Sequence, residues 1–211
     1  MANGNTSPGC RCFQGVANSA TFATMHPVLA YTDRIIPLDP PVREELLGAF
    51  IRQEFAKGAC LLRAGQTSQH YQFIESGLVK SSFYKEDKEF IMTFFKENIL
   101  FTEINSYLTG APSKYQLLAL EPTTVYRIAR PDIERLCREH HAVETLFKQL
   151  LAFASLGMMK RISEMLEENA TVRYRSFVQE KGPLLQRISL GDLAAYLGIT
   201  QVSLSRIRAA Q

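Results

Sequence analysis

Polar side chains near the C-terminus recur on the side of a predicted helix that apolar residues leave free. Gln201 and Arg206 carry planar groups with paired hydrogen-bonding atoms, and Val202 and Ser203 lie between them. A guanidinium can donate two hydrogen bonds to guanine O6 and N7, and a carboxamide can pair with adenine. These residue types therefore suit the reading of base edges in duplex DNA.

Other residues beside them suit the DNA backbone instead. Thr200 stands where this helix begins, and Arg208 lies near its end. A helix N-terminus and a point charge hold phosphates without specifying sequence, so we assign both residues to phosphate contacts. Ser189, at the start of the preceding helix, completes the candidate DNA-binding set.

A helix-turn-helix is predicted to position these side chains. Ser189 and Asp192 can form a capping arrangement that starts the first helix, and Gly198 lies where the turn is expected to need a positive φ. The shared core is predicted from Leu193, Leu197, Ile199, Leu204 and Ile207. An ordinary helical hairpin is the structural alternative. The sequence ends three residues after Arg208, so we expect any β wing to precede the two helices.

The segment from Glu54 to Ile128 has the pattern of strands and turns. Short apolar runs are separated by Gly58, Gly65 and Gly77, and Lys85 to Lys88 forms a charged hairpin tip. Strands are expected at Phe55, Cys60 to Leu62, Tyr71 to Ile74, Leu78 to Tyr84 and Phe90 to Phe95. Such spacing predicts a β sandwich or barrel, preceded by a short helix around Pro41 to Arg52.

A long helix is predicted from Ala142 to Glu168, with apolar residues at spacings of three and four. Its apolar positions are Val143, Leu146, Leu150, Phe153, Gly157, Met158, Met159, Ile162, Met165 and Leu166. This face fits a dimer seam, and packing against the chain's own β domain is the alternative. We expect Asn169 to end the helix in the left-handed conformation and Thr171 to cap the next one, forming a hinge.

Composition places the chain among ordinary globular proteins. Of 211 residues, 46% are hydrophobic and 21% charged, and the length suffices for two domains. The formal net charge is +3, and its excess lies at the C-terminal end, since residues from Thr171 onward carry six basic and two acidic side chains. No apolar run approaches the roughly 20 residues that cross a bilayer, so we expect a cytoplasmic protein.

The first 24 residues are rich in Ser, Asn, Gly and Ala and lack periodicity, which predicts a disordered tail. The tail contains Cys10 and Cys12. Together with Cys60 and Cys137 these are too few and too scattered for a disulfide framework, so we expect reduced thiols.

With these features in place, the chain resembles the Crp/Fnr superfamily of dimeric transcription regulators over about Phe55 to Ile207. The resemblance rests on the order of the parts, on the run from Tyr71 to Gly77, and on Leu193 to Ile199 followed by Leu204 to Ile207. It implies an α+β fold with an N-terminal β jelly roll (a double-stranded β-helix), a long dimerisation helix and a C-terminal helix-turn-helix domain. The corresponding divisions are residues 25–140, 141–169 and 170–211.

The resemblance also implies an effector pocket. In cyclic-nucleotide binders of this fold a Gly-Glu pair meets the ribose, and an Arg followed by a small hydroxyl residue clamps the phosphate. The matching stretches supply Thr102, Glu103, Ile104, Asn105, Ser113, Lys114 and Tyr115. Glu103 matches, but Lys114 offers a hydrated point charge where a bidentate guanidinium is needed, so cyclic AMP is not favoured. An unknown ligand, no ligand, and a role for Glu103 in orienting the loop stay open.

No resident cofactor, metal or catalytic motif is expected. Cys10 and Cys12 are closer in sequence than the chelating pairs of iron–sulfur proteins. The four histidines, His26, His70, His140 and His141, form no recognisable ligand set, and the last two suit a solvated helix start. The chain has no P-loop, nucleophile elbow or zinc spacing, which argues against an enzyme.

The resemblance implies a homodimer joined through the helix near residues 142–168. Its two recognition helices would enter successive major grooves about 34 Å apart on an approximately palindromic double-stranded site. An effector would bias the hinge near Asn169, RNA polymerase is a further suggested partner, and no membrane contact is expected. The alternative is a ligand-sensing or protein-interaction module that no longer reads DNA, which would lack a steep salt dependence of DNA binding.

Overall fold

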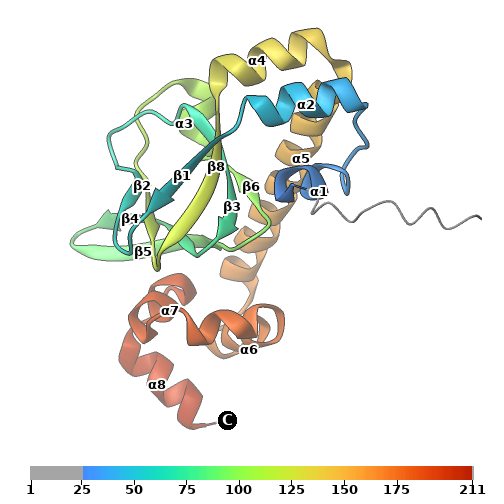
Figure 1. Ribbon diagram of the computed structural model, residues 1–211. Coiled ribbons are helices and arrows are strands. Elements are labelled where there is room, and N and C mark those ends of the chain that lie inside the picture. Colours follow the sequence, from blue (N-terminus) through green and yellow to red (C-terminus); the bar gives the residue numbers. More distant parts are fainter. Residues whose placement is uncertain (1–25, 211) are drawn as a thin grey trace, which may run out of the picture.

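The computed structural model describes residues 26–210, so the tail expected at residues 1–24 lies outside the described residues. The parts follow the predicted order of short helices, a β roll, a long helix and a C-terminal helical part (Figure 1). The α+β class with an N-terminal jelly roll is therefore confirmed.

The roll consists of two four-stranded antiparallel sheets. The first has the order β1 (Ile51–Phe55), β8 (Thr123–Ala129), β3 (His70–Ser76) and β6 (Leu100–Phe101). The second has the order β2 (Cys60–Leu62), β7 (Gln116–Ala119), β4 (Val79–Lys85) and β5 (Lys88–Phe95). Glu86 and Asp87 have φ of 51° and 59°, which forms the two-residue turn between β4 and β5 at the predicted hairpin tip.

The central strands of the first sheet, β3 and β8, are covered on both faces, and successive side chains in each strand point to opposite faces. Ile74 and Val125 pack between the two sheets, whereas Phe73 and Ile128 pack on the outer face against helices. All four side chains are fully buried. This explains why four consecutive residues of β3, Tyr71 to Ile74, are all buried, whereas a sheet with one solvated face would expose every second one.

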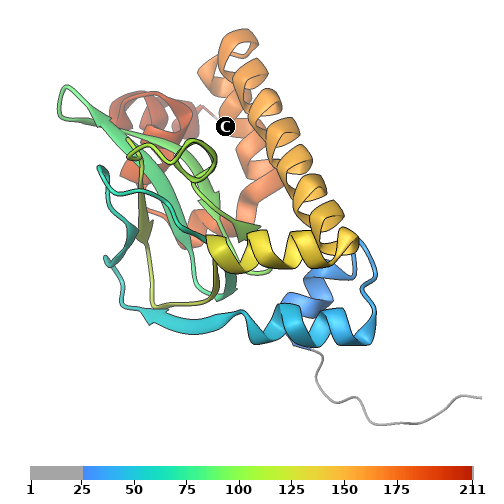
Figure 2. The same ribbon diagram turned by 90° about the horizontal axis from the view of Figure 1, so that it is seen from above.

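Four helices cover the outer face of the first sheet (Figure 2). They are α1 (Pro27–Thr32), α2 (Pro40–Gly48), α4 (Arg130–Glu139) and the first half of α5 (His141–Glu167). A further short helix, α3 (Ile104–Thr109), connects the two sheets between β6 and β7. Helix α2 ends earlier than predicted, because the chain already enters β1 at Ile51.

Helix α5 has two halves with different surroundings. In the first half, Val143, Leu146 and Leu150 are buried against the chain's own roll. For this half, the predicted alternative to a dimer seam therefore holds. Seven apolar side chains farther along are 41–81% exposed, namely Phe153, Leu156, Met158, Met159, Ile162, Met165 and Leu166. Although α5 has 27 residues, neither it nor any other helix among residues 26–210 is long and apolar enough to span a bilayer.

The junction after α5 differs from the prediction. Asn169 has a φ of −75° and is the N-cap of α6 (Ala170–Lys181), where its side chain accepts hydrogen bonds from the backbone of Thr171 and Val172. Thr171 therefore lies inside the helix that it was expected to cap. The prediction was wrong because Asn favours both helix ends, and here its side-chain oxygen satisfies the free N–H groups of the next helix.

The C-terminal helices pack on the outer face of the second sheet. After α6 come a short 3-10 helix (Gly182–Gln186), α7 (Leu190–Leu197) and α8 (Gln201–Ala209). Leu78, Ile91 and Phe94 of the roll share one buried cluster with apolar residues of these helices. No strand occurs between residues 170 and 210, so the part of the chain described there has no β wing.

Candidate nucleic-acid interface and ligand-binding region

The first helix of the predicted helix-turn-helix begins with a reciprocal cap. The Ser189 hydroxyl accepts a hydrogen bond from the Asp192 amide at 3.0 Å, and the Asp192 carboxylate accepts one from the Ser189 amide at 3.2 Å. The predicted capping arrangement is confirmed. It fixes the start of α7 by satisfying two N–H groups that the helix leaves free.

The turn between the two helices has the predicted geometry. Gly198 ends α7 with a φ of +70°, which glycine adopts without the steric cost of a side chain. Thr200 then caps α8 by accepting a hydrogen bond from the Ser203 amide at 3.1 Å. The hydroxyls of Thr200 and Ser203 also lie 3.0 Å apart, which holds both at the start of α8.

Helix α8 has one buried apolar side and one polar side. Leu204 is 1% exposed, whereas Val202 is 63% exposed. Of the seven candidate DNA-binding residues, Ser189, Thr200, Gln201, Val202, Arg206 and Arg208 are exposed and Ser203 is half-buried. The helix lies at the end of the molecule opposite α4 (Figure 1), so the roll does not cover its polar side.

Three basic side chains hold the C-terminal end of α7, a role that sequence reasoning missed. Arg161 donates to the Tyr196 carbonyl, and its guanidinium carbon lies 4.0 Å from the centre of the Tyr196 ring. Arg173 donates to the Leu197 carbonyl at 3.0 Å, and Lys181 donates to the Tyr196 hydroxyl at 2.8 Å. Cations at this end compensate the helix dipole. Part of the C-terminal basic excess therefore stabilises the domain internally.

An ion pair joins α7 to the roll. Lys80 on β4 donates to Asp192 at 2.8 Å and to Glu89 on β5 at 2.9 Å, and its side chain is 9% exposed. Burial alone would lower the pKa of Lys80, but the hydrogen bonds to the two carboxylates raise it. Burial would raise the pKa of Asp192, and the bonds from Lys80 and Ser189 lower it. Both groups therefore stay charged at neutral pH.

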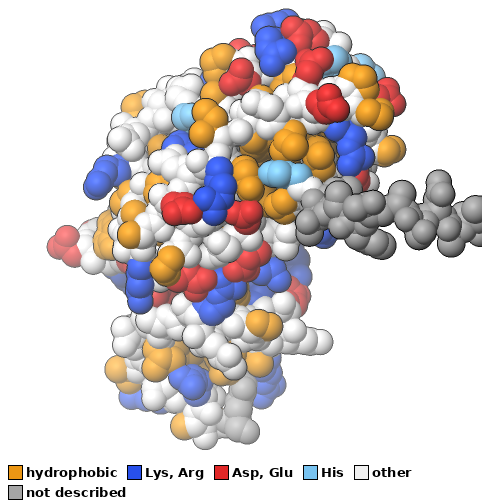
Figure 3. All heavy atoms as spheres, viewed as in Figure 1, with side chains coloured by type: hydrophobic (Ala, Val, Ile, Leu, Met, Phe, Trp, Pro, Cys, Tyr) orange, Lys and Arg blue, Asp and Glu red, His pale blue; other side chains and the backbone are white. Residues whose placement is uncertain are grey.

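A second ionic contact lies beside the first. Arg187, just before α7, donates to Glu97 and Glu121 of the roll, each at 2.6 Å. Burial would raise the pKa of Glu97, but the hydrogen bonds from Arg187 and from backbone amides lower it. Figure 3 shows acidic and basic side chains gathered where the roll meets the C-terminal helices.

The residues predicted for an effector pocket are mostly engaged with the protein itself. The Glu103 carboxylate caps α3 by accepting hydrogen bonds from the amides of Asn105 and Ser106 at 3.2 and 2.9 Å. Thr102 is buried and donates to the His70 carbonyl at 2.9 Å. Ile104 and Asn105 form the first turn of α3. These contacts support the reading in which Glu103 orients the loop.

The second stretch of predicted pocket residues is divided between interior and surface. Ser113 is 2% exposed, and its hydroxyl is bonded to the backbone of Tyr115. Lys114 is exposed, with its ammonium 5.1 Å from the centre of the Tyr115 ring. The Lys114 ammonium thus lies over an aromatic ring.

The roll contains a cavity of about 320 Å³ at the start of β3. Its wall consists of Leu61, Leu62, Gln66, Thr67, Ser68, Gln69, His70, Gln72 and Arg127. None of the seven predicted effector residues belongs to this wall. No sequence signal singled out its residues, because they come from three strands and one loop.

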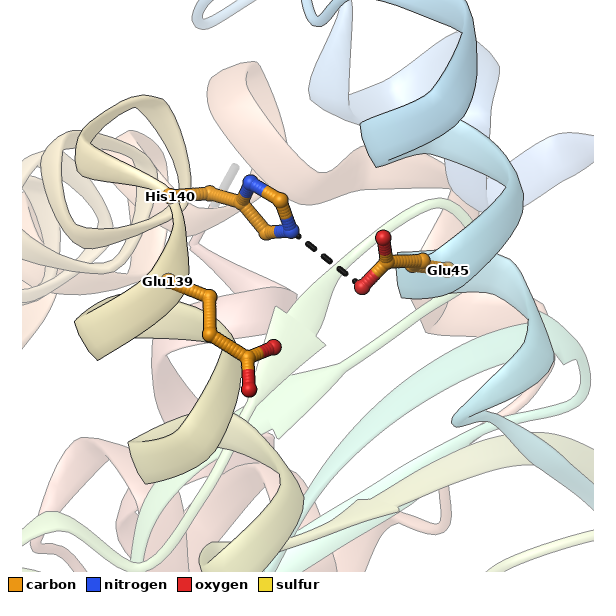
Figure 4. Close-up of side chains that lie close together, drawn as sticks. All are labelled: Glu45, Glu139 and His140. Carbon is orange, nitrogen blue, oxygen red and sulfur yellow. Dashed lines mark hydrogen bonds and ion pairs between the residues drawn. The ribbon is translucent and has the colours of Figure 1, made fainter.

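One group of side chains has the composition of a metal site. Glu45, Glu139 and His140 offer ligand atoms within 4.8 Å of one another (Figure 4). The guanidinium of Arg135 already forms ion pairs with both carboxylates. Its Nη1 atom lies 2.7 Å from a carboxylate oxygen of Glu139 and 3.7 Å from one of Glu45. We therefore interpret the group as an ion-pair cluster that joins α2 to the α4–α5 junction. His140 and His141 stand at the start of α5, as predicted.

Comparison with known proteins agrees with this architecture. The family model described as "Cyclic nucleotide-binding domain" matches residues 52–140. No curated protein matches the chain.

Among solved structures, FixK2 from Bradyrhizobium japonicum has 16% identity and a TM-score of 0.67, covering 76% of this chain and 83% of its own. A putative Crp/Fnr-family regulator from Eubacterium rectale has 15% identity and a TM-score of 0.65, covering 81% and 82%. A CooA mutant from Carboxydothermus hydrogenoformans has 17% identity and a TM-score of 0.62, covering 78% and 77%. The chain thus has a cyclic nucleotide-binding domain over residues 52–140 and the fold of the Crp/Fnr transcription regulators.

Proposed function

We propose that the protein is a homodimeric, cytoplasmic transcription regulator that binds specific DNA through α8 and has no enzymatic activity. The observation that carries this proposal is the exposed polar side of α8, held by Gly198 and Thr200 in a helix-turn-helix. The solved structures of similar fold include Crp/Fnr regulators, which supports the same class. The divisions at residues 25–140, 141–169 and 170–211 serve as effector, dimerisation and DNA-binding parts.

The candidate residues in and around α8 contact different parts of the DNA. Arg206 and Gln201 contact base edges, and Val202 and Ser203 complete the surface that enters the major groove. The phosphate contacts come from Thr200 and Arg208, with Ser189 at the edge. Such contacts fix the position of the helix without specifying sequence.

The exposed half of α5 supports the dimer. Seven neighbouring apolar side chains on one helix form a surface that monomeric proteins seldom leave in water. Pairing with a second copy would bury them and set the two copies of α8 on an approximately palindromic site, with half-sites about 34 Å apart. RNA polymerase is the further partner that this class suggests.

An effector of the roll would act on DNA binding through the contact between roll and α7. The helix-turn-helix would exist in two states, docked on the roll and released from it. A ligand in the roll would shift the balance between them by no more than its difference in affinity for the two states. Cyclic AMP is not favoured, because the Glu103 carboxylate already accepts hydrogen bonds from α3 and the Lys114 ammonium lies over the Tyr115 ring.

The test is a selection of DNA from a random duplex library by the full chain, followed by fluorescence anisotropy with the selected site. Arg206→Ala should weaken binding to the selected site by roughly 10- to 100-fold and leave binding to random DNA nearly unchanged. The matched control is Arg138→Ala, since Arg138 is an exposed arginine on α4, remote from α8. It should bind like the wild type.

Two outcomes would reject the proposal. In one, the selection yields no enriched sequence and binding falls little with added salt, as expected for a protein-interaction module. In the other, Arg206→Ala and Arg138→Ala bind the selected site equally well.

A further inference from the structure

The cavity in the roll has one charged residue in its wall. Of the nine residues that line it, Arg127 alone carries a full charge, since burial and the nearby Arg127 lower the pKa of His70 and favour its neutral form. Gln66 and Gln69 are exposed and form the mouth, while Leu61 and Leu62 are each 7% exposed and form an apolar inner wall.

Arg127 lacks a negative partner. Its Nη1 donates to Gln53 at 2.6 Å, and its Nη2 lies 3.1 Å from the neutral ring of His70. The Nε atom is buried and has no hydrogen-bond partner. No carboxylate of residues 26–210 forms an ion pair with this guanidinium, and burial accordingly lowers the pKa of Arg127. A half-buried cation without a counterion costs free energy, which a bound anion would recover.

Gln72 faces the same cavity and is also incompletely bonded. Its side chain is 3% exposed, and its Oε1 atom is buried without a partner. Buried polar atoms are nearly always hydrogen-bonded in native proteins. A ligand that offers a donor near Gln72 and an anionic group near Arg127 would satisfy both residues.

Charge and size narrow the class of ligand. One guanidinium balances one negative charge and matches the two oxygens of a carboxylate. The two leucines favour an apolar body, and about 320 Å³ is at the small end of ligand pockets. We propose that the cavity binds a small organic monocarboxylate, with its carboxylate on Arg127 and its apolar body against Leu61 and Leu62.

This site differs from the one that the resemblance to cyclic-nucleotide binders implies. Glu103, Ser113 and Lys114 do not line the cavity, and Arg127 lies on β8 rather than in the loop after α3. The proposal concerns ligand binding by the roll. Binding of a carboxylate in this cavity does not depend on whether the chain binds DNA.

The test measures the melting temperature of the full chain with benzoate and hexanoate as probes, and with benzamide and hexanamide as uncharged matches. At a hundred times its Kd, a carboxylate that binds here should raise Tm by roughly 5–10 °C. The amides should raise it far less. Arg127→Gln should abolish the rise in Tm caused by the carboxylates. Arg127→Lys should reduce it, because the ammonium keeps the positive charge but lacks the two parallel N–H donors of the guanidinium.

The matched control is Arg52→Gln on the neighbouring strand β1, whose side chain is 49% exposed and outside the cavity wall. It should keep the full carboxylate effect. Crystals soaked in 4-bromobenzoate give a second measurement that does not depend on the folding of any variant, with bromine expected beside the two leucines and the carboxylate on Arg127. Equal stabilisation by acids and amides, an unchanged effect in Arg127→Gln, or no bromine signal in the cavity would overturn the proposal.

Discussion

The ammonium group of Lys80 in the roll lies 2.8 Å from the carboxylate of Asp192 at the start of the helix-turn-helix. The two residues are 112 positions apart in sequence, and their side chains are 9% and 13% exposed. Asp192 also caps α7 through Ser189. One carboxylate thus caps the first helix of the helix-turn-helix and attaches it to the roll.

Replacing Lys80 by Met should destabilise the protein. The change keeps a side chain of similar length but leaves Asp192 and Glu89 partly buried without their cation. Removal of one member of a buried pair costs roughly 3–5 kcal/mol, and the bonds from Ser189 should keep the loss near the lower value. Urea unfolding followed by circular dichroism measures it.

The control for this change is Lys57→Met, because Lys57 is exposed in the turn between β1 and β2. It should alter the free energy of unfolding by no more than about 0.5 kcal/mol. Equal stabilities of the two variants would mean that the Lys80–Asp192 contact contributes nothing.

The same pair predicts a dependence of stability on acid. The pKa of Asp192 is lowered in the folded protein, so its contribution is fully present above the unfolded value of about 4 and is lost as the pH falls through the folded value. Asp192→Asn should therefore be less stable than the wild type at pH 6, and the difference should shrink towards pH 3. Urea midpoints at the two pH values measure this, and a constant difference would contradict it.

Much of the candidate DNA-binding surface could be predicted from the sequence because its determinants are local. The caps at Ser189 and Thr200 and the turn at Gly198 depend on neighbours within a few residues, and all three were found where predicted. The turns predicted at Gly58, Gly65 and Gly77 are local in the same sense, and all three glycines have a positive φ.

Features that depend on distant pairing could not be predicted in this way. Gln72, Arg127 and Leu61 lie in one wall only because the two sheets close around them, and no short spacing connects them. The docking of Asp192 on Lys80 depends on the same long-range packing. Asn169 was misassigned for a different reason, since its side chain suits either end of a helix.

Gly77 provides a test of local conformation in the roll. Its φ is +106°, and a methyl group there would lie 2.4 Å from Thr123 Oγ1 and 2.8 Å from the Pro122 carbonyl. Gly77→Ala should cost roughly 3–5 kcal/mol from backbone strain and overlap combined. Gly58 has a φ of +83° with nothing within 4 Å, so Gly58→Ala should lose only about 1–2 kcal/mol. Similar unfolding curves for the two variants would contradict this difference.

The exposed half of α5 gives the test of assembly. Ile162 is 57% exposed on α5, so Ile162→Glu should leave the monomer folded. In a dimer seam its carboxylate would be taken out of water, which should weaken dimerisation by roughly 30-fold or more. Analytical ultracentrifugation over a range of concentrations measures the effect, with Ile51→Glu as control because Ile51 is 73% exposed on β1. A wild type that stays monomeric at all concentrations, or equal weakening by both substitutions, would remove α5 as the dimer seam and with it the spacing of the two recognition helices.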